Sequence, residues 1–162
     1  MTDRSVTHAT FVVERTFDVP PARVFQAFAD PEVKARWFAA PDDWGSAEVS
    51  MDFRVGGREI NNGGPKGGPI HYFESEYHDI VPDERIVYSY WMHMDEKLIS
   101  VSVATIEFRP QGTGTHLVLT EQGAFLDGLD QAQGREEGTR QLMGALAAEL
   151  EREPAGATQR SR

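Results

Sequence analysis

The chain has 162 residues, of which 40% are hydrophobic and 26% are charged, and it contains no cysteine. This length and composition are typical of a single soluble domain, and the lack of cysteine excludes disulfides, thiolate catalysis and cysteine-bound metals. The formal net charge of −10 disfavours nucleic acid and anionic membrane surfaces as partners, because both repel a strongly acidic protein.

The beginning of the chain predicts one strand and two short helices. Alternating β-branched and aromatic residues indicate a strand at Ala9–Val19. Helices are expected at 21–28 and 31–36. Each begins with a proline, which suits a first helical turn because the backbone N–H groups there have no helical partner. Asp30 precedes the second helix as a good N-cap.

The next stretch is rich in glycine and predicts short strands between loops. A loop is expected at Pro41–Gly45, followed by a strand at Glu48–Val55 with alternating apolar residues. Gly56-Gly57 breaks that strand. Arg58–Asn61 continues it briefly, and Asn61–Pro69 is expected to be a flexible connection, because few of its residues can pack.

A meander of antiparallel strands occupies the centre of the predicted fold. Its long strands are Ile70–Ile80, Arg85–Met92, Leu98–Arg109 and Thr115–Gln122. From Gly123 the chain is expected to leave the sheet, and from Asp130 to about Arg152 the apolar period becomes helical. Residues 153–162 are small, polar and basic, and we expect them to form a disordered tail after a single domain at 1–152.

The apolar stripe of the last helix indicates which face it buries. The stripe consists of Thr139, Leu142, Met143, Leu146 and Leu150, and charged residues such as Arg135 lie largely off it. These elements predict an α+β fold, in which a curved antiparallel sheet of six or seven strands surrounds the long C-terminal helix. One helix of about 20 residues cannot fill such a hollow, so bulky side chains or a ligand must occupy the rest.

Strict alternation along the central strands predicts the residues that face inward. They are His71, Phe73, Ser75, Tyr77, Ile86, Tyr88, Tyr90, Ala104, Ile106, Phe108, Leu117, Leu119 and Glu121. An aromatic face with a few polar groups is typical of a small-molecule pocket, and equally of a packed core whose tyrosine hydroxyls reach the rim. The residues alone leave both interpretations open.

Several motifs, in their order along the chain, resemble the START-like (SRPBCC) superfamily, in the branch related to the activator of the 90-kDa heat-shock-protein ATPase. The matching stretches are Pro21–Phe28, Asp30–Phe38, Asp52–Arg58, Asp79–Tyr88, Gly114–Gly123 and Arg135–Thr139. The resemblance implies the helix-grip fold and a deep hydrophobic cavity. Relatives include lipid carriers, plant-hormone binders, polyketide aromatases and cyclases, and co-chaperone domains, so the fold does not settle the function.

The leading hypothesis is the binding of a small hydrophobic or aromatic molecule in this cavity. Its apolar walls are predicted to be Phe25, Phe28, Phe53, Phe73, Tyr88, Tyr90, Phe108, Leu142, Met143 and Leu146. Arg58, His71 and Glu121 are expected to orient the ligand. Trp37 and Trp44 are assigned either to the cavity mouth or to the small end of the core, with Trp44 as the better gate.

Two alternatives remain open. A cyclase- or aromatase-type enzyme would use His71, Glu121 and Tyr88 for acid–base chemistry, with burial raising the pKa of Glu121. The structural reading of Glu121 is that Arg58 or a tyrosine holds it. A co-chaperone-like interaction module is the third class.

The remaining predictions concern cofactors and surroundings. No cofactor is expected, and no metal, because the five histidines are scattered along the chain. The expected compartment is the cytoplasm, since the chain has neither a secretory leader nor an apolar run of about 18 residues. The oligomeric state is open, a homodimer included.

Overall fold

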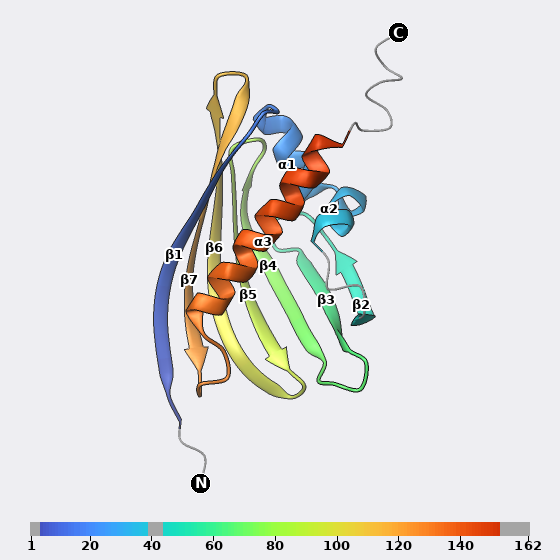
Figure 1. The fold of residues 1–162 in the computed structure, drawn as a ribbon, viewed down its shortest axis with the longest axis vertical. Coiled ribbons are helices and arrows are strands. Elements are labelled where there is room, and N and C mark those ends of the chain that lie inside the picture. The colour runs from blue at the N-terminus through green and yellow to red at the C-terminus, as the bar shows by residue number, and fades with distance from the viewer. Residues whose placement is uncertain (1–3, 39–43, 153–162) are drawn as a thin grey trace.

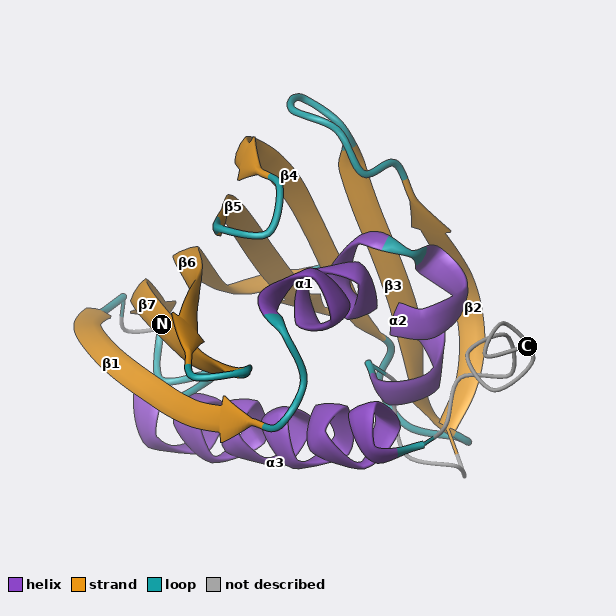
Figure 2. Cartoon of the chain, turned by 90° about the horizontal axis from the view of Figure 1, so that it is seen from above, coloured by secondary structure: helices purple, strands orange, loops and turns teal. Residues whose placement is uncertain are grey.

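The computed structural model describes residues 4–38 and 44–152. Over these residues, seven strands form one antiparallel sheet in the order β1-β7-β6-β5-β4-β3-β2, which curves around three helices (Figures 1 and 2). The elements are β1 (Val6–Phe17), α1 (Pro21–Ala29), α2 (Pro31–Trp37), β2 (Trp44–Met51), β3 (Arg58–Pro65), β4 (His71–Val81), β5 (Arg85–Met94), β6 (Lys97–Gln111), β7 (Gly114–Leu126) and α3 (Ala132–Glu151). The predicted α+β helix-grip architecture is confirmed.

The helices all lie on the concave side of the sheet. Seen from above, α3 runs across the open side of the arc (Figure 2), and α1 and α2 lie in the upper half of the molecule (Figure 1). Both short helices begin at their prolines, and the Asp30 carboxylate accepts a 2.9 Å hydrogen bond from the backbone N–H of Glu32. None of the helices in the described ranges has the length and apolar character needed to cross a membrane.

The prediction for the segment between α2 and β4 is wrong in part: residues 48–51 are strand and the strand resumes at Arg58, as predicted, but the element bounds differ. Trp44 and Gly45 belong to strand β2 and not to a loop, whereas Phe53 and Val55 follow the strand; residues 41–43 lie outside the described ranges. Residues 61–65 of the predicted flexible connection are instead the second half of β3, which continues to Pro65, and residues 66–69 form the turn toward β4. Neighbouring backbones supply its hydrogen bonds, so the glycines need no side-chain packing to stay in the sheet.

The ends of the long strands also differ from the prediction. β7 does not end at Gln122 but continues to Leu126, where it pairs with Val6, so β1 begins earlier than expected and ends at Phe17. Gly123 marks a close approach and not an exit from the sheet: a Cβ there would lie 2.7 Å from the Ser102 Oγ. The predicted disordered tail at 153–162 lies outside the described ranges.

The aromatic core fills the end of the arc beneath α1 and α2. Phe25 packs edge-to-face on Phe53 and Phe108, at centroid distances of 5.8 and 5.5 Å, and Phe28 packs on Phe108 at 5.5 Å. The Trp37 indole N–H donates to the carbonyl of Ala27 at 2.9 Å, which holds α2 against α1. The predicted inward faces of β6 and β7 are buried. Beside this core, the hollow of the sheet contains a cavity.

The Gly56-Gly57 pair makes a tight turn that fastens the start of β3 to β4. Gly56 has a φ of +85°, a backbone conformation that favours glycine. A Cβ on Gly57 would lie 2.1 Å from the carbonyl oxygen of Asp52. The backbone of Tyr77 accepts from the Gly56 N–H at 2.8 Å and donates to the Gly57 carbonyl at 3.0 Å. These contacts explain why both positions in the Asp52–Arg58 stretch are glycine.

Replacing Gly57 with alanine is therefore expected to lower the free energy of unfolding by about 2 kcal/mol, because backbone atoms obstruct the new methyl group. Gly144→Ala is the matched control. A Cβ at this position of α3 meets nothing within 4 Å, so the variant should gain about 0.5–1 kcal/mol from helix propensity. Urea unfolding of both variants tests this, and equal stabilities would contradict it.

Candidate functional site: a cavity between the sheet and α3

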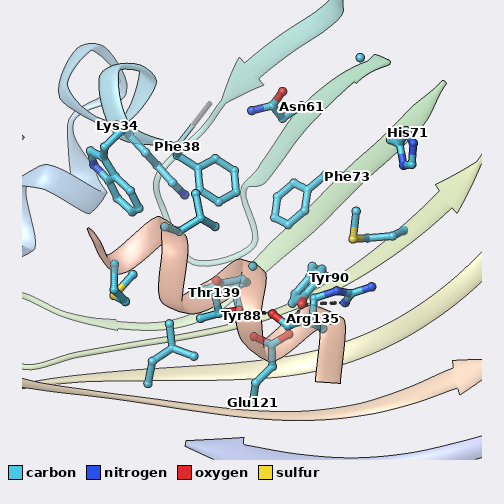
Figure 3. A pocket seen from close by; sticks show the side chains of 18 of the residues that line it. Lys34, Phe38, Asn61, His71, Phe73, Tyr88, Tyr90, Glu121, Arg135 and Thr139 are labelled. Atoms are coloured by element: carbon cyan, nitrogen blue, oxygen red, sulfur yellow. Dashed lines mark hydrogen bonds between the residues drawn. The ribbon is translucent and has the colours of Figure 1, made fainter. Parts of the chain in front are cut away.

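A cavity of about 350 Å³ lies between the concave face of the sheet and α3 (Figure 3). Its walls come from α1, α2, α3 and strands β2, β3, β4, β5 and β7. The predicted site residues that line it are Phe28, Trp37, Trp44, His71, Phe73, Tyr88, Tyr90, Glu121, Leu142 and Met143. The structure thus brings these side chains together around one space, most of whose surface is apolar.

Five predicted site residues do not line the cavity. Phe25, Phe53, Phe108 and Leu146 belong to the core at the end covered by α1 and α2. Arg58 lies on the outer face of the sheet, exposed, 3.7 Å from the Glu76 carboxylate and over the Trp91 ring. The reason is register: Arg58 pairs with Glu76, so both side chains point away from the concave face.

Aromatic side chains form the end of the cavity near β2. The Trp44 ring stacks on the His71 ring with 4.7 Å between centroids, and Phe38 packs edge-to-face on Phe73 at 5.4 Å. The rings continue inward from Phe73 to Tyr90 at 5.1 Å. Trp37, 3% exposed, serves both as a wall of the cavity and as part of the core.

His71 and Glu121 lie at opposite ends of this cavity (Figure 3). In the sheet, His71 aligns with Met94 of β5, whereas Glu121 aligns through Ala104 with Tyr88. Those positions on β5 are six residues apart, or about 20 Å at 3.3 Å per residue. The acid–base set of His71, Glu121 and Tyr88 is therefore not assembled.

A polar network surrounds Glu121. The Tyr90 hydroxyl donates to the Glu121 carboxylate and accepts from the Arg135 guanidinium at 2.9 Å. Arg135 also donates to Ser100 Oγ at 2.9 Å and forms an ion pair with Asp130. The tyrosine alternative for holding Glu121 is thus confirmed, and Arg58 is not its partner.

The surroundings of Glu121 act on its pKa in opposite directions. Burial raises the pKa of this carboxyl above its ordinary value of 4.5, and the Tyr90 hydrogen bond and the Arg135 charge limit the rise. Burial, followed by the negative charge of Glu121, raises the pKa of Tyr90 and of Tyr88. Both tyrosines therefore keep their protons at neutral pH and can act as hydrogen-bond donors.

The sequence interpretation missed two cations that line the cavity, Arg135 and Lys34. Arg135 lies one helical turn before Thr139, so the stripe of α3 extends back to it; that i, i+4 spacing was the available signal. The Lys34 ammonium donates to Glu59 at 2.7 Å, and the Tyr77 hydroxyl donates to the same carboxylate at 2.7 Å. Nothing local in the sequence links α2 to β3 in this way.

No group of three metal-ligating side chains gathers anywhere in residues 4–38 and 44–152. The cavity instead combines apolar walls with a few directed polar groups, which suits the reversible binding of an organic molecule.

A family model and solved structures of similar proteins show which proteins this chain resembles. The family described as "Activator of Hsp90 ATPase homolog 1-like protein" matches residues 18–152. The crystal structure of Mll3558 from Rhizobium loti is 52% identical, with a TM-score of 0.84, over 90% of this chain and 99% of that one. No curated protein matches the sequence.

Two further structures extend the comparison. A putative uncharacterized protein from Rhizobium leguminosarum is 43% identical, with a TM-score of 0.88, over 94% of this chain and all (100%) of that one. The AHSA1-like protein from Aeromonas hydrophila is 19% identical over 88% of this chain and 92% of that one, with a TM-score of 0.64, and shares the fold.

The raised pKa of Glu121 predicts a specific pH dependence of stability. The native state binds this proton more tightly than the unfolded state does, so ionised Glu121 lowers stability above its native pKa. That cost disappears as the pH falls toward the ordinary carboxyl value. The stability of Glu121→Gln relative to the wild type should therefore be higher at about pH 8 than at about pH 5.

Urea unfolding at the two pH values measures this difference. Glu107→Gln removes a carboxylate on the outer face of β6 and is the control, for which no comparable change is expected. A Glu121→Gln difference that is independent of pH, or that grows on acidification, would contradict the assignment.

Proposed function

The chain belongs to the family of Activator of Hsp90 ATPase homolog 1-like proteins, and from this premise we propose that it binds a small hydrophobic or aromatic molecule in the cavity between the sheet and α3. The observation that carries the proposal is the unfilled space itself. A cavity of about 350 Å³ with a mostly apolar lining that includes several aromatic side chains is within the usual range for small-molecule sites.

The wall formed by α3 supports this proposal. Gly134 and Gly138 line the cavity from successive turns of the helix, and a Cβ at either position would meet no atom within 4 Å. A glycine inside a helix costs about 0.5–1 kcal/mol relative to alanine. The helix thus leaves space where a larger side chain would both stabilise it and fill the hollow, which is expected if a ligand occupies that space.

The cavity favours binding over the enzyme alternative. A cyclase or aromatase using His71 with Glu121 requires both groups at one substrate, and the register of the sheet separates them. The family takes its name from an activator of the Hsp90 ATPase. A co-chaperone role would depend on a surface for a large partner, whereas the cavity has the size of a small-molecule site.

The test uses N-phenyl-1-naphthylamine, a neutral dye whose fluorescence rises in apolar surroundings. Saturable binding to the wild type is expected. Gly138→Leu should weaken binding by about tenfold or more, because the new side chain extends into the cavity. Gly144→Leu is the matched control: it places the same side chain on the same helix outside the cavity lining, and should bind like the wild type.

Circular dichroism establishes that both variants are folded before they are compared. Wild-type affinity in folded Gly138→Leu would show that the dye binds elsewhere. A wild-type protein that binds neither this dye nor other small apolar probes would overturn the proposal.

A further inference from the structure

The ion pairs around the cavity leave one carboxylate without a cation. Within residues 4–38 and 44–152, two carboxylates line the cavity, and of these Asp130 is paired with Arg135 while Glu121 is in no ion pair. Lys34, the other cation in the lining, is paired with Glu59 at 2.7 Å. Each cation thus has its own carboxylate, and the group carries a net charge of −1 when Glu121 is ionised.

Glu121 is deeply buried, with 4% of its surface exposed. One of its oxygens accepts from the Tyr90 hydroxyl, and the other has no hydrogen-bond partner among the described residues. The Tyr88 hydroxyl, on the same concave face, has no hydrogen-bond partner there either. A buried carboxylate without a directly bound cation is costly, so a positively charged donor placed at the second oxygen of Glu121 would be stabilised there.

We propose that the ligand is a primary or secondary amine on an aromatic or apolar body, and that its ammonium group binds Glu121 and Tyr88. This inference rests on the proposed function and names the chemical class of the ligand. The ammonium donates to the unpartnered oxygen of Glu121 and to the Tyr88 hydroxyl. The apolar body occupies the space between the aromatic walls and the glycines of α3.

The aromatic surroundings suit a cation. Tyr88 and Tyr90 lie 6.0 Å apart with a tilt of 39°, and Phe73 adjoins Tyr90. Ring faces attract ammonium groups, most strongly where water is excluded. The guanidinium of Arg135 already lies 5.5 Å from the centroid of Tyr90 and 5.4 Å from that of Phe125, so a cation is accommodated at this end.

An anionic ligand fits less well. It would add a second uncompensated negative charge beside Glu121, because Arg135 is already engaged by Asp130, Ser100 and Tyr90. It would bind only after Glu121 had taken up a proton. A cationic ligand meets the opposite situation, since it supplies the missing charge directly, and the net charge of −10 favours its approach.

The experiment compares three probes of closely similar shape: 2-(1-naphthyl)ethylamine, 2-(1-naphthyl)ethanol and 1-naphthylacetate. The affinity of each probe is measured by its displacement of N-phenyl-1-naphthylamine at neutral pH. At this pH the first probe is a cation, the second is neutral and the third is an anion. The wild type should bind the amine about tenfold more tightly than the alcohol, and the acetate most weakly. Glu121→Gln, nearly identical in shape, should abolish the preference for the amine, so that the amine and the alcohol bind with similar affinity.

Glu107→Gln is the matched control, because it removes one negative charge from the outer face of β6 without touching the cavity. It should keep the preference for the amine, which separates a local contact from general attraction by an acidic protein. Saturable binding of the neutral dye shows that each variant retains the cavity.

The outcomes separate this inference from the proposed function. Equal affinity for the three probes, or tightest binding of the acetate, would overturn the inference and leave the cavity as a binding site. A preference for the amine that survives in Glu121→Gln would also overturn it. If neither the dye nor any probe binds the wild type, the proposed function fails, and the inference fails with it.

Discussion

The mismatch between a strongly curved sheet and the helix that closes it determines most of this structure. An α-helix with its side chains is about 10–12 Å wide, so α3 alone cannot occupy the hollow of the arc. At one end α1 brings Phe25 and Phe28 down onto Phe108, α2 places Trp37 against Phe28, and the hollow is filled. Between the sheet and residues 134–143 of α3, the inward-facing side chains instead line a cavity, to which Phe28 of α1 and Trp37 of α2 also contribute walls.

The polar network around Glu121 connects this cavity to the fold. Arg135, near the start of α3, donates to Tyr90 of β5 and to Ser100 of β6, and its charge is balanced by Asp130. These bonds anchor the helix across the open side of the sheet. They also place one buried carboxylate of β7 against a tyrosine and not against a cation. The groups that position α3 therefore also set the charge that a ligand would meet.

Several features of the fold could be read from local patterns because their causes are local. Prolines mark the starts of α1 and α2, and alternation along β6 and β7 correctly identifies the buried inward-facing residues. The sequence interpretation failed where a glycine is compatible both with a loop and with a position inside a strand. The glycines of β3 predict a flexible loop, and Gly123 predicts the end of a strand. In the structure, hydrogen bonds to the backbone of neighbouring strands keep both segments in the sheet.

By itself, the sequence determined which side chains of one strand share a face, because a period of two directs Tyr88 and Tyr90 to one side of their strand, and Leu119 and Glu121 to one side of theirs. It could not determine how far along the sheet those side chains lie from one another, or which helix residue reaches them. His71 is distant from Glu121, and Arg135 is close to Tyr90, as a result of strand register and of the path of α3 across the sheet. Both arise from contacts between segments remote in the chain, so only the tertiary structure decided them.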